Sequence, residues 1–385
     1  MTKTVDLSKI SARAAQLQPP QPMGSYAPED CVFLLKDVSS LVKEQGNEER
    51  ERAIQSGVHY SEMLPVEYVP NDSYVKLFHS MLDTASETIA RYVAVVSEQI
   101  LKLKHSEQDE PLVLVSLARA GTPIGVLIKR YIKQVHNIDL PHYSISIIRE
   151  KGFDENALAY IIDTHKTTNL QFIDGWTGKG AINIALKEAC EDFEQKFGIR
   201  LDERMAVLAD PSAAVSIFGT REDIVIPSAC LNSTVSGLMS RTFQKDGLIG
   251  EYDYHGSKYY QEFTDIDLSN YYVDHISAHF ADMTLTDEDF PKDTTVRNSG
   301  MAEVLEIGKV FGIPNHQLIK SGINETSRVL LRRIPWKIIV DRLDNPELTH
   351  ILMLANERNV PVEEYKEMGY ACCGLIKDMN GDELS

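Results

Sequence analysis

Between residues 112 and 226, short apolar segments alternate with longer segments of helical periodicity, and this alternation limits the fold more than any other feature. The hydrophobic pattern predicts helices at residues 122–134 and 181–197, and strands at 112–115, 143–148, 170–173, 205–209 and 224–226. Alternation of this kind produces a mostly parallel sheet with helices on both faces. The fold class is therefore α/β, and ligands are expected where the strands end.

The flanking segments divide the chain further. Residues 84–104 have a helical pattern, with Thr84 and Glu87 as a predicted capping box at its start. Residues 285–298 are polar and acidic and read as a linker; helical patterns at 301–311 and 346–358 and a short strand at 360–362 follow. We therefore predict a loose segment at 1–23, a large domain at 24–284, a linker at 285–298 and a small α/β domain at 299–385.

Charge and cysteine content restrict the partners. The net charge of −18 argues against general nucleic-acid binding, but residues 297–385 carry 11 basic and 13 acidic side chains and are nearly neutral. Five cysteines without a CxxC pair argue against structural zinc and fit a reducing compartment. With no long apolar run and no signal-peptide pattern, we expect a cytoplasmic protein without a membrane partner.

A first candidate site follows the predicted strand 112–115, in SLARAGTP. Arg119, Ala120 and Gly121 lie between that strand and the next helix, where backbone amides, a helix dipole and a guanidinium can hold an anion. The alternative is a tight turn with one surface arginine.

A second candidate site follows the strand 170–173, in FIDGWTGKGA. Asp174 can accept hydrogen bonds from hydroxyl groups, and a loop rich in glycine can wrap a phosphate with its backbone amides; that loop contains Thr177, Gly178, Lys179 and Gly180. The loop is not a Walker A motif, because Gly180 follows Lys179. The alternative is a turn whose glycines let the helix pack closely.

A third candidate site lies in residues 226–242, which are dense in small polar side chains. Such groups can orient a polar ligand, or they can cap a helix and form a packing face. The candidates for the acceptor side of a reaction are Ser228, Cys230, Asn232, Ser233, Thr234 and Arg241.

Taken together, these motifs resemble one family. SLARAGTPIG, FIDGWTGKGAI, IPSACLNSTVSGLMSRT and KYYQE occur in the order found in proteins that join a divergent type I phosphoribosyltransferase domain to a PELOTA-type RNA-binding domain. The same family is also known as StiP-type cysteine proteases and is associated with tellurium resistance. The resemblance covers residues 24–377 and implies a phosphoribosyltransferase-like sheet followed by an L7Ae/PELOTA-like domain.

The resemblance implies a glycosyltransferase that uses phosphoribosyl pyrophosphate and Mg²⁺ in nucleoside-type or nucleotide-type biosynthesis under stress. Asp174 and Arg119 would be the catalytic residues, and the 177–180 loop would hold the 5′-phosphate. No cluster of side chains with metal-ligand spacing is apparent. A homodimer is left open. In the C-terminal domain, the candidates for RNA contact are Arg328, Arg332, Arg333 and Lys337.

Two other functions stay open at this point. The first is a cysteine hydrolase or protease with Cys230 as the nucleophile, whose base would be His59, His255, His275 or His279. The second is a non-catalytic nucleotide sensor that binds RNA, which is favoured by Gly175 at the position where the transferase family has a second acid.

Overall fold

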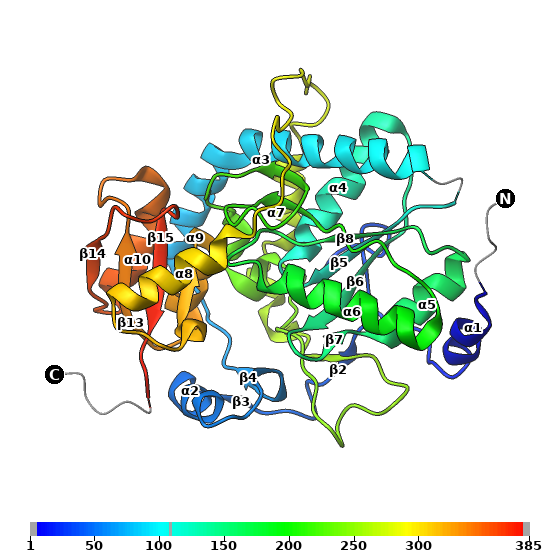
Figure 1. Cartoon of the computed structure of the whole chain (residues 1–385), viewed down its shortest axis with the longest axis horizontal. Helices are drawn as coiled ribbons and strands as arrows, with labels where there is room; N and C mark the ends of the chain where they lie inside the picture. Colours follow the sequence, from blue (N-terminus) through cyan, green and yellow to red (C-terminus); the bar gives the residue numbers. More distant parts are fainter. Residues whose placement is uncertain (1–5, 108–109, 380–385) are drawn as a thin grey trace.

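The computed structural model describes residues 6–107 and 110–379. A seven-stranded sheet forms the larger part, with the strand order β1-β6-β5-β8-β9-β10 (Figure 1). Neighbours in this order are parallel, and only β7 pairs antiparallel, with β6. The strands are β1 (Val32–Phe33), β5 (Val113–Ala118), β6 (His142–Ile148), β7 (Gly152–Phe153), β8 (Leu170–Ile173), β9 (Ala206–Ala209) and β10 (Ile217–Thr220). The predicted fold class is confirmed.

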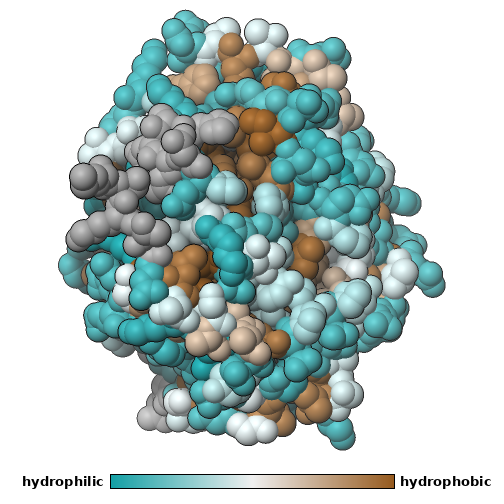
Figure 2. Space-filling view, turned by 90° about the vertical axis from the view of Figure 1, so that its right-hand side faces the viewer, coloured by the Kyte–Doolittle hydropathy of each residue, from teal (hydrophilic) through white to brown (hydrophobic). Residues whose placement is uncertain are grey.

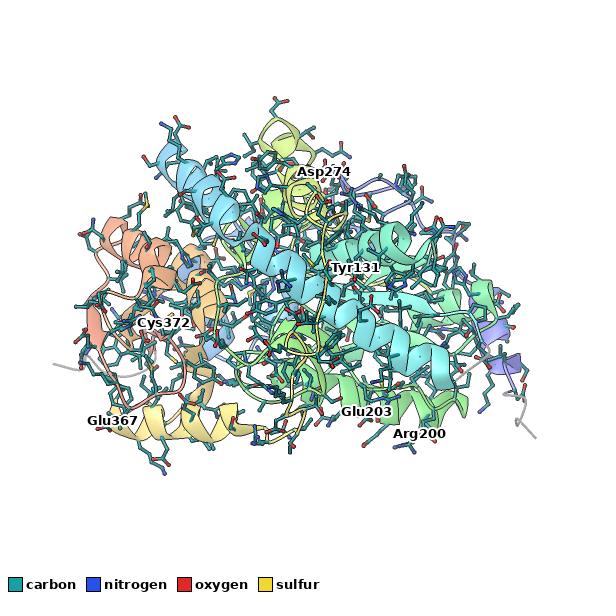
Figure 3. The ribbon with its side chains drawn as sticks, turned by 90° about the horizontal axis from the view of Figure 1, so that it is seen from above. Tyr131, Arg200, Glu203, Asp274, Glu367 and Cys372 are labelled. Carbon is teal, nitrogen blue, oxygen red and sulfur yellow. The ribbon has the colours of Figure 1, made fainter. Side chains whose placement is uncertain are left out.

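Helices cover both faces of this sheet, and each face has its own apolar core. One face is covered by α3 (Asp72–Glu107), α4 (Gly121–His136) and α7 (Ser269–Ser277), and α3 runs obliquely across it (Figure 3). Within that layer, Tyr131 of α4 packs edge-on against Phe280, which follows α7 in the chain. The other face is covered by α1 (Ser8–Ala14), α5 (Glu155–His165) and α6 (Ala181–Phe197).

Helix α3 begins earlier than predicted. The side chains of Tyr74, Phe78 and Leu82 are fully buried. The apolar stripe of the helix therefore extends toward the N-terminus beyond its predicted start. The side chain of Asn71 accepts a hydrogen bond from the Tyr74 amide and caps the first turn. Thr84 lies inside the helix and donates to the Ser80 carbonyl, so the predicted capping box at Thr84 and Glu87 is wrong.

The N-terminal segment predicted as loose contains α1. Ile10 is fully buried on α5, and two polar contacts hold the helix there. Ser11 donates to Asp163 and Arg13 donates to Asn156. Because this helix depends on contacts with a helix far away in the sequence, the local composition did not predict it.

The predicted strand at 224–226 is absent from the described sheet, which ends on this side with β10. The backbone of residues 224–226 instead meets the C-terminal domain, because Asn324 accepts from the Ile226 amide and donates to the Ile224 carbonyl. A tertiary contact thus replaces strand pairing there.

Short elements fill the rim of the large domain. They are β2 (Lys36–Asp37), β3 (Glu44–Gln45), α2 (Asn47–Gln55), η1 (Tyr60–Glu62), β4 (Leu64–Pro65), η2 (Pro227–Ala229), η3 (Asn232–Val235), β11 (Gly256–Ser257) and η4 (Gln261–Ile266). In Figure 1, α2, β3 and β4 lie below the main sheet, beside the C-terminal part.

The C-terminal part is a small α/β domain with a four-stranded sheet in the order β12-β15-β13-β14 (Figure 1, left). The half-buried Asp223 of the large domain joins it by accepting from the amides of Ile323 and Ala371. Cys372 lies inside this sheet (Figure 3). The elements are α8 (Ser299–Val310), η5 (His316–Leu318), β12 (Ile319–Ser321), α9 (Ile323–Arg332), β13 (Pro335–Val340), η6 (Pro346–Leu348), α10 (Thr349–Glu357), β14 (Val362–Glu364) and β15 (Cys372–Ile376).

The face that carries α1 and α5 is mostly hydrophilic, with hydrophobic residues in small separate patches (Figure 2). Within the described residues, no helix combines the length and the apolar character needed to cross a membrane.

Candidate functional site

A pocket of about 250 Å³ lies between the large domain and the C-terminal domain. Its floor comes from the ends of β5 and β6 and from the loops that follow β5 and β8, and its other walls come from α2, β12 and α9. This is the position that parallel strands predict for a ligand site. Arg119 and Ala120 from the first predicted loop and Asp174, Thr177, Gly178, Lys179 and Gly180 from the second all line it.

The first loop is fixed by a buried ion pair. Nη1 of Arg119 lies 3.2 Å from Oε1 of Glu67 and donates to the Met239 carbonyl at 2.8 Å. Its Nη2 is buried and has no hydrogen-bond partner in the described chain. Gly121 lies outside the lining, and a Cβ there would lie 2.3 Å from the Ile173 carbonyl oxygen, so it serves the close approach of the loop to β8.

The second loop connects the two domains. Tyr370 donates to the Gly178 carbonyl, and the Lys179 ammonium donates to the His316 carbonyl. Trp176 donates from its indole to Glu325 at 3.3 Å. The loop between β8 and α6 therefore holds the C-terminal domain against the sheet.

The hydroxyl of Thr177 points away from any ligand. It donates to Asp210 at 2.5 Å and accepts from Ser212 at 2.8 Å, and all three residues are buried. Asp210 also pairs with Arg221. This network shapes the loop, so only the backbone of Thr177 is left for ligand binding.

Positive charge dominates the pocket. Nine basic side chains line it, against the two carboxylates of Asp174 and Glu325. Glutamates pair with three of the nine, Arg119, Arg328 and Arg333, and the partners are Glu67, Glu325 and Glu51. Two others, Arg149 and Lys179, donate to neutral oxygens. The remaining four make no hydrogen bond or ion pair with the residues that the structure describes: Arg50, Arg241, Lys320 and Arg332.

These cations destabilise one another. Burial, together with Arg333 nearby, lowers the pKa of Arg50 to about 10, and Arg50 is only 1% exposed. Burial and then Arg50 lower the pKa of Arg241 to about 9. The pKa values of Lys320 and Arg332 are lowered for the same two reasons, burial first and neighbouring cations second. Arg50 is buried and the other three are half-buried, so their partly desolvated and mutually repelling charges favour the binding of a compensating anion.

The pKa values of the two carboxyl groups in the pocket are shifted in opposite directions. Burial raises the pKa of Asp174 to about 7, and its carboxylate accepts from the Gly175 amide. Burial would also raise the pKa of Glu325, but Arg328 and Lys320 outweigh it and the pKa is lowered. Two carboxylates amid nine cations are a poor donor set for Mg²⁺, which prefers several oxygen ligands. Within the described residues, no three histidine, cysteine or acidic side chains are placed to hold a metal ion.

The third candidate stretch divides between pocket and core. Arg241 lines the pocket and stacks on Tyr60, with its guanidinium carbon 4.5 Å from the ring centre. The other five lie outside the pocket lining and are at most 7% exposed: Ser228, Cys230, Asn232, Ser233 and Thr234. Their neighbours Leu231, Val235 and Met239 are fully buried, which draws the segment into the core.

None of the five cysteines is exposed, and all are free thiols. Burial raises the pKa of Cys230 to about 12, and the neighbouring Tyr74 hydroxyl only partly opposes this rise. Within the described residues, no hydrogen bond joins a cysteine to a histidine. The four histidines considered as bases bond to other residues: His59 to Ser61, His255 to Ser146, His275 to Asp83 and His279 to Ser86.

Three of the four predicted RNA contacts face the pocket. Arg328, Arg332 and Arg333 line it, whereas Lys337 lies elsewhere and pairs with Glu363. Arg333 donates to Glu51 of α2 at 2.6 and 2.9 Å. Arg328 stacks on Trp176, its guanidinium carbon 4.4 Å from the ring centre.

Sequence reasoning missed several lining residues. Arg149 follows directly after β6, so the rule that sites lie at strand ends could have identified it. Tyr60 lies in the 57–63 stretch, where an aromatic side chain could stack on a ring, but this signal is weak because such runs are usually surface segments. Arg50 lies in a run of alternating charges that reads as a solvated helix face. For Lys320 we find no signal in the sequence.

Comparison with known proteins gives two family matches. Residues 24–277 match the model described as the tellurite-like stress resistance cysteine protease StiP, and residues 298–378 match the PELOTA RNA binding domain. A curated relative, "Cysteine protease StiP" of Acinetobacter baylyi, is 31% identical over 352 residues, which cover 88% of this chain and 90% of the relative.

These matches correct the predicted function. The family and the relative are both named as cysteine proteases, so they favour the cysteine hydrolase or protease that was left open as an alternative. The predicted phosphoribosyl transfer and the glycosyltransferase class are wrong, and with them the use of phosphoribosyl pyrophosphate as donor. The PELOTA-type domain and the link to tellurium resistance are supported.

Proposed function

The chain belongs to the StiP family of tellurite-like stress resistance cysteine proteases, and on that premise we propose that it is a cysteine hydrolase controlled by an anionic ligand in the basic pocket. The observation that carries the ligand is the group of four cations without counter-ions, Arg50, Arg241, Lys320 and Arg332. A ligand with several negative charges would replace the missing partners and remove their mutual repulsion.

The proposed nucleophile is Cys230. Its thiolate would attack the peptide carbonyl carbon to form a thioester while the amine leaves with a proton, and water would then hydrolyse the thioester. A thiol with a pKa near 12 is protonated at neutral pH, and Cys230 is fully buried. The conformation described is therefore an inactive one, and cleavage requires a rearrangement that exposes and deprotonates the thiol.

A chain of contacts supports control from the pocket. Arg119, which lines the pocket, donates to the Met239 carbonyl and pairs with Glu67. Glu67 also accepts from the Ser233 amide at 2.8 Å. Met239 and Ser233 both belong to the segment that carries Cys230. An anion that bound the free Nη2 of Arg119 would compete with Glu67 for the guanidinium charge and so loosen the segment.

The use of Mg²⁺ remains a prediction, limited to an ion that the ligand carries. Because the pocket's own donor set fits the ion poorly, Mg²⁺ would arrive on the phosphates of a ligand rather than on Asp174 and Glu325. We route no step of the hydrolysis through it.

The test compares wild type with Cys230→Ser, and with Cys190→Ser as a matched control in α6. Cleavage of fluorescently labelled casein is followed with and without inorganic pyrophosphate, and iodoacetamide labelling of each thiol is read by mass spectrometry. We expect pyrophosphate to increase both casein cleavage and Cys230 labelling, and only Cys230→Ser to abolish cleavage. Cleavage that persists in Cys230→Ser would refute the nucleophile.

A further inference from the structure

A cluster of basic side chains of the C-terminal domain faces the pocket. Four of its basic side chains, Lys320, Arg328, Arg332 and Arg333, line the pocket. On the rest of the domain, several basic side chains are neutralised by carboxylates: Lys309 pairs with Glu306, Lys337 with Glu363 and Arg342 with Asp344. Arg358, Lys366 and Lys377 also lie outside the pocket lining, so the pocket gathers in one place four of the ten basic side chains that residues 299–385 contain.

We infer that the pocket receives the phosphorylated end of an RNA strand held by the C-terminal domain. This inference rests on the proposed anion pocket and identifies the partner of that same site. It joins two independent observations, the match of residues 298–378 to an RNA-binding domain and the four cations of that domain that point into the pocket.

The size and charge of the pocket favour an end over the middle of a strand. The pocket volume of about 250 Å³ lies at the low end of the range for ligand pockets, which favours a short terminal group over a long stretch of strand. A terminal phosphate monoester carries a charge of about −1.5 to −2 at neutral pH, whereas an internal diester carries one negative charge. Two deeply placed groups, Arg50 and Nη2 of Arg119, lack a partner there and suit the more highly charged group.

The walls also suit a base. Tyr60 is stacked with Arg241 and lies 5.0 Å from Arg149, and Trp176 is stacked with Arg328. Guanidinium and aromatic planes stack on unpaired RNA bases. The terminal nucleotide can thus be held at its phosphate and at its base without reading a long sequence.

The experiment measures the fluorescence anisotropy of a short single-stranded RNA, labelled at its far end, that carries a 5′-phosphate, a 3′-phosphate or hydroxyls alone. Wild type, Arg332→Ala and Lys337→Ala are compared, and a free mononucleotide and inorganic pyrophosphate serve as competitors. We expect a phosphorylated end to tighten binding by about tenfold or more, because it accepts charge-assisted hydrogen bonds that a hydroxyl end cannot. Arg332→Ala should remove that difference, and Lys337→Ala should keep it.

The possible failures can be told apart. Equal binding of phosphorylated and hydroxyl RNA, with pyrophosphate still bound, would overturn the RNA end and leave the anion pocket intact. Binding of the free mononucleotide without competition by phosphorylated RNA would also overturn it, in favour of a free nucleotide. Absence of binding by pyrophosphate and by every RNA would overturn both the inference and the anionic control.

Discussion

Nη1 of Arg119 and Oε1 of Glu67 lie 3.2 Å apart, and both side chains are at most 4% exposed. Glu67 is placed between this arginine and the Ser233 amide, so one carboxylate connects the pocket to the segment that carries Cys230. With the direct bond from Arg119 to the Met239 carbonyl, this pair connects the anion site to the segment of the proposed nucleophile.

Removing the guanidinium should therefore destabilise the protein. In Arg119→Ala, Glu67 keeps one amide donor but loses its counter-ion, and the free energy of unfolding should fall by about 3–5 kcal/mol. Urea denaturation measures this change. Arg52→Ala, which removes an exposed pair with Glu48, is the control and should cost less than about 1 kcal/mol. Similar losses in the two variants would contradict the role given to the buried pair.

Removing an unpaired pocket cation should have the opposite effect on stability. Arg332→Met keeps the aliphatic packing but removes one of several repelling charges, so the free protein should become more stable by roughly 1 kcal/mol. The same variant should lose most of the stabilisation that pyrophosphate gives to wild type in thermal denaturation. A variant that is less stable without ligand would show that Arg332 is compensated by a partner in the free protein.

Anion affinity should decrease as the pH rises from about 6 to about 9. Asp174 becomes charged above a pKa of about 7, and Lys179 becomes neutral above a pKa of about 8, so both changes remove positive charge from the pocket. Sulfate is a suitable calorimetric probe, because its own charge is constant over this range. In Asp174→Asn the decrease near pH 7 should vanish and the one near pH 8 should remain. A profile identical to wild type would contradict the raised pKa of Asp174.

The same raised pKa has a consequence for stability. The folded protein retains a proton on Asp174 that the unfolded chain has released, so the contribution of Asp174 to stability falls as the pH rises from about 4 to about 7. Urea titrations of wild type and Asp174→Asn should therefore diverge over that range, with the variant relatively more stable at pH 7 than at pH 4. Parallel stability curves would argue against this linkage.

Docking of the C-terminal domain should depend on Arg333. It donates twice to Glu51 of α2, which is 1% exposed. Arg333→Ala leaves that carboxylate buried with a hydrogen bond from Gln55 but without its ion pair, and we expect a loss of about 2–4 kcal/mol. Hydrogen exchange of α2 should become faster in this variant and stay unchanged in Lys337→Ala. Unchanged exchange in both would show that α2 does not depend on this pair.

The sheet could be predicted from the sequence because its strands are short apolar runs separated by amphipathic helices. The elements that flank the sheet were harder to predict. Helix α1 depends on a single buried residue, Ile10, and on hydrogen bonds to Asp163 and Asn156, which lie far away in the sequence. The 224–226 segment has the composition of a strand but is used for contacts with Asn324. A local hydrophobic pattern contains no information about hydrogen bonds from a side chain that is distant in the sequence.

The site was predicted in part for a similar reason. Arg119, Asp174 and Lys179 could be found because they follow strands of a parallel sheet. Arg50 and Lys320 come from a rim helix and from the other domain, and only the docking of the two domains brings them to the pocket. The chemistry was misjudged because Gly-rich loops at strand ends suit several anionic ligands and do not identify a reaction.

The central claim is that the pocket is built for an anion with several charges, and titration calorimetry with inorganic pyrophosphate tests it most directly. Wild type should bind one pyrophosphate with saturation, Arg332→Ala should bind at least about tenfold more weakly, and Lys337→Ala should match wild type. No saturable binding by wild type, or binding that is the same in Arg332→Ala, would contradict the account.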